Sequence, residues 1–451
     1  MSIIDFLINL NNEYSGEIVS FFTWYNSMGR KVLDFLYTVF NSAFNVLLAI
    51  AVIVSALYIV MTVYTVIRKK NEKNLTVNEE KLPFVTVQIP TFNELAAIRC
   101  AKACMEFDYP KDKYEIIIGD DSNKAEISRK IKEFASHHSM IKVTKRESNY
   151  GYKPGNLNNM LKHSKGEFLV IFDSDFIPEQ DFLKKIISPF SDDKKLAAVQ
   201  ARWKIINSNQ NIITSLGSTI LSVYHHISIP FVYGNRRIVF LCGSAEAVRK
   251  DILIKLGGWD DGNLTEDIEF SLRLLERGYK IKYLENLECD CEVPYTLKDL
   301  YRQQMRWAYG VIHSSKKHFR SIIASKHIDF KDKFCIYGLY NTGGYLLSVL
   351  LAGLFITGTL SFITHPPAPV QWGMFFKDLL RNILLTSGLL IASIVALFKA
   401  KKSNLTFKML ASSFSYGLVV TYYVNVGIFK AIAKIPMQWY MLNKKGNKIA
   451  E

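Results

Sequence analysis

The sequence predicts an α/β fold, a mostly parallel and doubly wound sheet flanked by transmembrane helices. Long uncharged runs lie near both ends of the 451-residue chain, and a central part alternates short apolar strands with helical segments. Residues 168–172 form a strand that is apolar on both faces. Such a strand belongs in the middle of a sheet that is covered on both sides, and repeated strand–helix units produce parallel sheets.

The central part, residues 83–320, is expected to be one cytosolic domain. Its first strands are expected at residues 85–89, 114–118, 141–144 and 168–172. Helical sequence runs to Met105 after the first strand and covers about 124–134 after the second. Ligands bind beyond the carboxyl ends of the strands in sheets of this kind. The polar residues that follow the strands are therefore the first candidates for a binding site.

The N-terminal part is expected to hold one interfacial segment and one span. Residues 1–42 are rich in aromatic residues but interrupted by charges, which indicates an amphipathic segment at the membrane surface. The aromatic residues expected at that surface are Phe21, Phe22, Trp24 and Tyr25. Residues 43–67 are uncharged and long enough to cross a bilayer, and residues 68–82 read as a charged linker.

Membrane character returns in residues 321–451, where about three spans and a basic tail are expected. The uncharged runs are residues 334–363, 382–398 and 409–429. Three spans after a cytosolic domain place the C-terminus outside, whereas the lysines of the tail favour the inside. Those lysines are Lys430, Lys434, Lys444, Lys445 and Lys448. One run is therefore a candidate for an interfacial or re-entrant helix, and the side of the C-terminus stays open.

The basic balance of the chain points to a membrane rather than to nucleic acid. Lys and Arg outnumber Asp and Glu by 56 to 41, and they cluster beside the apolar runs, as at residues 68–70 and 399–402. Positive-inside topology explains this placement. We expect an integral membrane protein, in the plasma membrane, surrounded by lipids and with a homo-oligomer as a further candidate partner. The six cysteines lack metal-ligand spacing, so reduced thiols are expected.

Two carboxylates, Asp173 and Asp175, directly follow the apolar strand at 168–172. Residues two apart at a strand end can face the same side. Hard divalent cations such as Mg²⁺ or Mn²⁺ are typically held by one or two carboxylates together with substrate phosphates. Both residues are therefore candidate metal ligands. The alternative is a solvated pair that caps a helix expected near Glu179.

The first two strands end in further candidates. Asp120 and Asp121 end the second strand, either as contacts to the base or ribose of a nucleotide or as caps of the next helix. The residues that end the first strand are Thr91, Phe92, Asn93 and Glu94. They offer an aromatic face and a carboxylate to a nucleobase, while a plain N-cap formed by Asn93 is the alternative.

Two predicted helix starts carry charged residues that could do chemistry. Lys153 lies in a glycine-rich turn, and backbone N–H groups with a lysine can bind phosphate, although such turns are common without function. Glu266 and Asp267 follow Thr265, and either carboxylate can act as a base toward an attacking hydroxyl. The alternative there is a capping box begun by Thr265.

A Gln-x-x-Arg-Trp pattern, Gln303, Arg306 and Trp307, lies on an expected amphipathic helix. Gln303 and Arg306 are three residues apart and share a face. Arg306 can bind a diphosphate bidentately, and Trp307 can stack on a sugar ring. The alternative is an Arg–Trp belt at the membrane surface.

Together these motifs resemble glycosyltransferase family 2, specifically its processive membrane branch of cellulose, hyaluronan and plant mannan synthases. The resemblance covers about residues 83–319 and the flanking apolar helices, with five motifs in the family's order. Residues 86–90 and 199–204 look most like the plant mannan synthases. The resemblance implies a GT-A type, Rossmann-like fold. Two features depart from the family: Phe92 stands where many members have Tyr, and the membrane region is small.

On the donor side, the resemblance implies that Asp120 or Asp121 contacts the nucleobase and that Lys153 contacts a phosphate. Asp173 and Asp175 look like the family's Asp-x-Asp pair, the second of which binds the metal. The end of the first strand would complete the donor site through Thr91, Asn93 and Glu94.

On the acceptor side, the resemblance implies that Asp267 is the catalytic base, with Glu266 beside it in contact with substrate. Residues 240–244, with Cys242 and Gly243, look like a segment that lies near the acceptor sugar. The residues implied to lie over the diphosphate and the acceptor are Gln303, Arg306 and Trp307, with Arg306 also taking part in catalysis.

The resemblance implies an inverting transfer from a UDP- or GDP-sugar to a growing β-linked glucan- or mannan-like polysaccharide, with Mg²⁺ or Mn²⁺. The small membrane region keeps a second function open, the addition of one or a few sugars to a lipid acceptor such as diacylglycerol or polyprenyl phosphate. A membrane scaffold or transporter with an inactive catalytic-like domain is a third, and the complete set of acidic residues opposes it.

Overall fold

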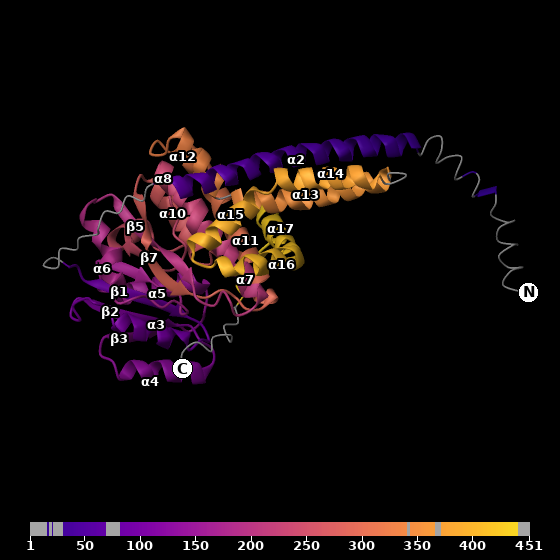
Figure 1. Cartoon of the computed structure of the whole chain (residues 1–451). Coiled ribbons are helices and arrows are strands. Elements are labelled where there is room, and N and C mark those ends of the chain that lie inside the picture. The colour runs from indigo at the N-terminus through magenta and orange to yellow at the C-terminus, as the bar shows by residue number, and fades with distance from the viewer. Residues whose placement is uncertain are drawn as a thin grey trace, which may run out of the picture. The chain divides into compact units, whose positions relative to one another are not determined.

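The computed structural model describes residues 16, 17, 20, 30–68, 82–340, 343–365 and 371–440 (Figure 1). These residues fall into two compact units, one formed by 30–57 with 349–388 and the other by 58–348 with 389–440. Several predictions lie outside the described residues, namely those for Phe21, Phe22, Trp24, Tyr25, Lys444, Lys445, Lys448 and most of the linker 68–82.

The second unit contains a seven-stranded sheet in the order β3-β2-β1-β4-β6-β5-β7. Its strands are β1 (Val85–Thr91), β2 (Tyr114–Asp120), β3 (Ile141–Lys145), β4 (Phe168–Ile171), β5 (Leu196–Ile205), β6 (Glu246–Arg249) and β7 (Lys280–Cys291). Only β6 runs antiparallel to its neighbours β4 and β5, and the other paired strands are parallel. The predicted α/β fold with a mostly parallel sheet is confirmed.

Helices cover both faces of this sheet because successive side chains of its strands point to opposite sides. Ile116 and Ile118 of β2 pack in one core with the helix α3. Ile117, between them, packs in a second core with α5. The helices of the domain are α3 (Ala96–Met105), α4 (Ala125–Ser136), α5 (Tyr152–His163), α6 (Phe182–Ile187), α7 (Ile212–Val223), α8 (Ile229–Arg236), α9 (Lys250–Lys255), α10 (Glu266–Glu276), α11 (Leu297–Ala324) and α12 (Phe330–Phe334).

The register of the sheet brings three strand ends to one edge. Thr91, the last residue of β1, pairs with Asp120 of β2, while Gln88 of β1 pairs with Ile171, the last residue of β4. Asp121 and Asp173 therefore leave the sheet at neighbouring points of this edge, as expected for ligand-binding residues in a parallel sheet.

The apolar helices of the chain include candidate membrane spans. These helices are α2 (Arg30–Ile67), α13 (Gly343–Thr364), α14 (Trp372–Leu385), α15 (Gly388–Lys399), α16 (Thr406–Ser415) and α17 (Gly417–Ile432). Within the described residues, α2, α13 and the segment Ile212–Arg236 are long and apolar enough to cross a bilayer, and α14 with α15 would make a fourth, broken span. Of the most apolar 18-residue window in the segment Ile212–Arg236, 78% is buried within the protein, so protein rather than lipid covers most of it.

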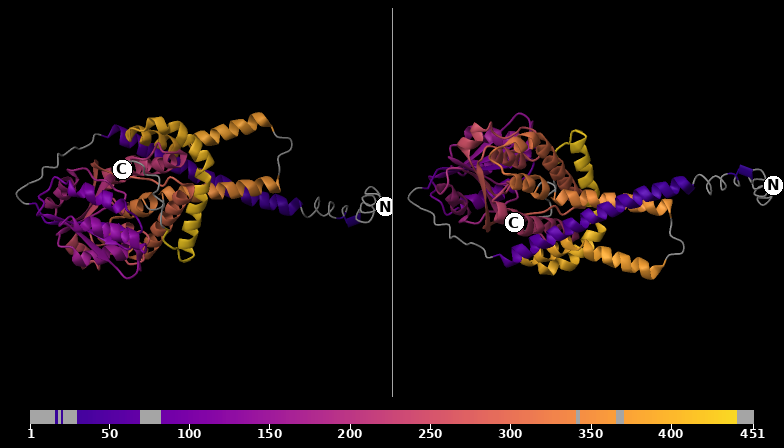
Figure 2. Two further views of the ribbon diagram at one scale, coloured as in Figure 1. Left: turned by 90° about the horizontal axis from the view of Figure 1, so that it is seen from below. Right: turned by 90° about the horizontal axis from the view of Figure 1, so that it is seen from above.

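The structure divides the uncharged runs differently from the sequence pattern. The helix α2 begins at Arg30, ahead of the expected start at residue 43. The run 382–398 is split between α14 and α15, and the run 409–429 is split between α16 and α17. The helix α17 packs along α11 of the domain that contains the sheet, and the yellow C-terminal helices remain beside this domain in both views of Figure 2.

Candidate functional site

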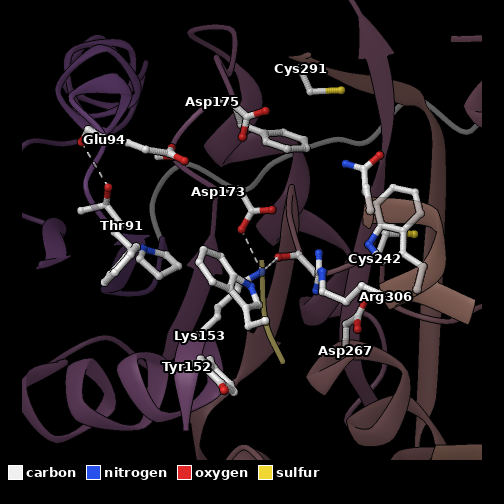
Figure 3. A pocket seen from close by; sticks show the side chains of 18 of the residues that line it. Thr91, Glu94, Tyr152, Lys153, Asp173, Asp175, Cys242, Asp267, Cys291 and Arg306 are labelled. Carbon is white, nitrogen blue, oxygen red and sulfur yellow. Dashed lines mark hydrogen bonds and ion pairs between the residues drawn. The ribbon is translucent and has the colours of Figure 1, made fainter. Parts of the chain in front are cut away.

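A cavity of about 180 Å³ opens at the shared edge where β1, β2 and β4 end. Its walls come from the loops after these strands, from the first turns of α5 and α10, and from α11 (Figure 3). Most of the residues singled out by the sequence line this cavity, namely Thr91, Glu94, Asp121, Lys153, Asp173, Asp175, Cys242, Gly243, Glu266, Asp267, Gln303, Arg306 and Trp307. Residues from 91 to 307 thus meet in one place.

Two of the predicted substrate-binding residues, Asn93 and Asp120, are not part of the cavity wall. The side chain of Asn93 donates to Asn123 Oδ1 at 2.7 Å and accepts from the Lys124 N–H at 3.1 Å. Asp120 is completely buried, and its Oδ1 accepts the Ser122 N–H at 2.9 Å. Asp120 and Asp121 are consecutive residues, so only one of them can point into the cavity. Both excluded side chains tie strand ends to the start of α4.

Lys153 lies at the centre of the site, on the first turn of α5. Its ammonium group pairs with Asp173 Oδ1 at 2.8 Å (Figure 3). It also pairs with Glu266 Oε1 at 3.0 Å and donates to the Gly243 carbonyl oxygen at 2.5 Å. Burial lowers the pKa of Lys153, but Asp173, Glu266 and Glu246 together raise it more, so the net shift is upward. The lysine therefore stays protonated, and it provides a fixed positive charge between the carboxylates of Asp173 and Glu266.

Asp267 lies on the first turn of α10, facing the cavity. Burial and the neighbouring carboxylate of Glu266 raise its pKa to about 7, against the opposing effects of Lys153 and Arg306. A carboxyl group with this pKa is suited to general-base catalysis near neutral pH. Thr265 occupies the N-cap position but makes no side-chain capping bond, so the alternative of a capping box is not formed.

The acidic pair Asp173 and Asp175 differs in exposure. The side chain of Asp173 is 36% exposed, whereas Asp175 as a whole residue is only 6% exposed. Within the described ranges, no group of three or more His, Cys, Asp or Glu side chains is arranged to hold a metal. Two carboxylate oxygens on one side of a cavity fit a hard cation whose remaining ligands are substrate oxygens and water, as is usual for Mg²⁺.

The Gln-x-x-Arg-Trp pattern lies on α11, the predicted amphipathic helix. The Arg306 guanidinium donates to the Leu264 carbonyl at 2.8 Å, which fixes it beside the loop that leads into α10. Trp307 approaches Trp203 of β5 at 6.4 Å between ring centroids, and Trp203 in turn lies 5.1 Å from Phe176. These three rings form an aromatic wall suited to the flat face of a sugar.

Several residues that line the cavity or hold its wall were not predicted. Arg146 forms a bidentate pair with Asp121 through its Nε and Nη2 atoms. Glu246, on the four-residue strand β6, accepts the Gly243 N–H at 2.9 Å, and burial raises its pKa well above the usual range. Neither residue belongs to a recognisable motif. The sequence signal that could have revealed Arg146 is the basic run Lys145-Arg146 beside an acidic strand end.

Trp439 is the third residue that sequence reasoning missed. It comes from the segment after α17, yet it lines the cavity. Its ring meets Phe92 edge-on at 5.8 Å and stacks on Tyr152 at 6.3 Å. The C-terminal segment therefore adds an aromatic side to the part of the cavity where β1 ends. A Trp-Tyr pair after the last apolar run was the available signal.

Comparison with known proteins identifies relatives of this arrangement. The family described as "Glycosyltransferase like family 2" matches residues 83–310. Glucomannan 4-beta-mannosyltransferase 2 of Arabidopsis thaliana is 32% identical over 57% of this chain and 50% of its own length. Glucomannan 4-beta-mannosyltransferase 7 of the same plant is 28% identical over 70% of this chain and 59% of its own length. The chain thus spans about half to three-fifths of the length of these relatives.

Among solved structures, a mannosyltransferase of Pyrobaculum calidifontis, in complex with GDP-Man and Mn²⁺, has a similar fold. The likeness covers 88% of this chain and all of that chain, with a TM-score of 0.60 and 17% sequence identity. This likeness confirms the GT-A type of the fold predicted from the motifs.

Proposed function

The chain belongs to the glycosyltransferase-like family 2, and on this basis we propose that it is a membrane-embedded, inverting hexosyltransferase. Its donor is a nucleotide-sugar, and its product is a β-linked polysaccharide. Because the plant relatives carry the name of glucomannan mannosyltransferases and the archaeal neighbour was solved with GDP-Man, we favour GDP-mannose over a UDP-sugar and a mannan-like over a glucan-like product.

One observation carries this proposal: Lys153 bridges Asp173 and Glu266 within the cavity that Asp267 also lines. The cation and the acidic pair suit a diphosphate with its metal, while Asp267 suits an attacking hydroxyl. A donor end and an acceptor end therefore meet in one cavity, which is the arrangement that a direct transfer requires.

In the proposed reaction, Asp267 accepts the proton of the acceptor hydroxyl as its oxygen attacks the anomeric carbon. The bond from that carbon to the diphosphate oxygen breaks on the opposite face, so the configuration inverts. Lys153 and Arg306 supply positive charge to the departing diphosphate. Asp175, with Asp173, would hold a Mg²⁺ or Mn²⁺ ion, which supplies further neutralisation of the diphosphate.

The apolar helices support an enzyme that is integral to a membrane, and its placement in the plasma membrane stays a prediction. The domain limits expected from the sequence, with catalytic residues 83–320 on the cytosolic side, are part of the proposal. The transfer of one or a few sugars to a lipid acceptor is the second candidate, because the apolar region is small.

The decisive experiment is incubation of the purified protein with a panel of nucleotide-sugars, each with Mg²⁺ or Mn²⁺. Released nucleotide and product size are measured together. A ladder or high polymer supports the polysaccharide synthase, and a single chloroform-soluble glycolipid supports the second candidate. Absence of both transfer and nucleotide release across the whole panel would overturn the proposal and favour an inactive scaffold.

We expect Arg306→Ala to lower kcat by roughly 10²- to 10³-fold, about 2.7–4 kcal/mol, because a preorganised positive charge near the diphosphate is lost. Initial rates of nucleotide release at saturating donor measure the change. Lys298→Ala, which removes an exposed cation from the same helix α11, is the matched control. Equal rates for the two variants would remove Arg306 from the catalytic role.

We expect Trp439→Ala to raise the KM for the nucleotide-sugar about tenfold, since stacking of an aromatic side chain on a base is worth about 1–3 kcal/mol. The change in kcat should be smaller, because the ring of Trp439 contacts Phe92, directly after β1, where we expect the nucleobase to bind. Trp439→Phe should recover most of the loss. Trp372→Ala, which changes an exposed tryptophan of α14, controls for loss of an indole, and an equal KM in both alanine variants contradicts the assignment.

A further inference from the structure

The turn formed by Cys242, Gly243 and Ser244 connects the proposed chemical groups of the site. The Gly243 carbonyl accepts from Lys153 at 2.5 Å, and Ser244 Oγ accepts the Asp173 N–H at 2.9 Å. A Cβ placed on Gly243 would lie 3.3 Å from both Asp267 Oδ2 and Lys153 Nζ. The turn therefore touches the metal side, the phosphate side and the base side of the cavity at once.

This turn has a backbone conformation that needs support. Gly243 has φ of 82° and Ala245 has φ of 52°, both in the left-handed region. An alanine rarely adopts that region, and such residues persist at functional sites only where the surroundings determine them. Some neighbouring group must therefore hold the segment from Cys242 to Ala245 in place.

The Gly243 N–H bonds to Glu246, and Gln200 of β5 makes three further hydrogen bonds that hold this turn. Its Oε1 accepts the Cys242 N–H at 2.7 Å, and its Nε2 donates to the Ser244 carbonyl at 2.9 Å and to the Ala245 carbonyl at 3.3 Å. The side chain is completely buried. The Gln200 amide thus bonds to the turn through both its oxygen and its nitrogen, and it does not itself line the cavity.

We propose that Gln200 is a positioning residue for sugar transfer, which fixes the Cys242–Ser244 turn and through it Lys153, Asp173 and Asp267. This inference rests on the proposed function and adds to it a residue that touches no substrate. Because the turn contacts Lys153 and Asp173 of the proposed donor side as well as Asp267, the loss of Gln200 should lower kcat and also raise the donor KM.

The test compares Gln200→Met with Gln88→Met in the full-length protein. Gln88 is equally buried on β1, but its Nε2 donates to Ser164 Oγ at 3.0 Å, away from the cavity. Both changes remove one buried amide and keep the side-chain length. We expect a similar fall in thermal unfolding temperature for both variants, whereas only Gln200→Met should lose kcat 10- to 100-fold and show a raised donor KM.

Ser244→Ala is the second variant, and it tests the positioning role of the turn if Gln200→Met does not fold. It removes the acceptor of the Asp173 N–H while leaving the bonds of Gln200 intact, so it should also lower kcat and raise the donor KM. Equal kcat in Gln200→Met and Gln88→Met, or an unchanged kcat in Ser244→Ala where only that variant folds, overturns the positioning role. An inactive wild-type protein would overturn the proposed function, and this inference with it.

Discussion

Asp267→Asn is expected to lower the kcat of sugar transfer by about 10²- to 10⁴-fold, the usual contribution of a general base. The amide keeps the size and the hydrogen-bonding shape of the carboxyl group, but it cannot take the proton of the acceptor hydroxyl. Asp267 lines the cavity from the first turn of α10, close to Gly243, whose added Cβ would lie 3.3 Å from its Oδ2. Initial rates with saturating donor and acceptor give the change in kcat.

Donor binding should survive this substitution, since the proposed phosphate and metal contacts belong to Lys153, Asp173 and Asp175. Titration calorimetry with the nucleoside diphosphate tests this, and we expect a Kd within about threefold of the wild type. Asp251→Asn is the matched control, because it removes an exposed carboxylate from the first turn of the neighbouring helix α9. Transfer by Asp267→Asn at the control rate would assign the base to another residue.

The pH dependence of transfer follows from the same carboxyl group. The pKa of Asp267 is raised to about 7 by burial and by Glu266, and only the deprotonated form can accept a proton. We therefore expect kcat/KM to rise about tenfold per pH unit below pH 7 and to level off above it. Lys153, whose pKa is raised, stays charged throughout this range. A kcat/KM that does not change between about pH 5.5 and 8.5 would contradict this assignment.

The sequence predicted the first half of the sheet well for a physical reason. The strands β1, β2 and β4 are buried on both faces, so their apolar runs stand out from the flanking polar sequence. The strand β6 has only four residues, Glu246–Arg249, and two of them are charged, so no such run marks it. The uncharged runs of the C-terminal half were visible, but the breaks within them depend on packing against other helices.

The site was predictable where a motif ended a strand or opened a helix, as for Asp173, Lys153 and Asp267. It was less predictable where tertiary contacts decide the direction of a side chain. Asp120 and Asp121 are equivalent in the sequence, yet only Asp121 reaches the cavity. Gln200 and Trp439 contact residues that are distant from them in the sequence, so the spacing of neighbouring residues could not reveal those contacts.

Asp175→Asn is expected to cause the second large effect, a loss of metal-dependent transfer. The change replaces a buried carboxylate with a neutral amide, a poor ligand for a hard cation. We expect the concentration of Mn²⁺ that gives half-maximal activity to rise at least tenfold and kcat to fall roughly 10²-fold, because the charge of the departing diphosphate is less well neutralised. A titration of activity with Mn²⁺ and with Mg²⁺, after chelation of bound metal, gives both quantities.

The control for this prediction is Asp192→Asn, which removes an exposed carboxylate after α6, outside the cavity. Direct binding of Mn²⁺, followed by electron paramagnetic resonance in the presence of the nucleoside diphosphate, separates lost metal binding from misfolding, which unfolding temperature also monitors. If Asp175→Asn binds Mn²⁺ and transfers sugar as the control does, the metal is held elsewhere. Transfer by the wild type that persists fully after chelation would instead mean that Lys153 and Arg306 neutralise the diphosphate without a metal, since these are the cationic side chains lining the described cavity.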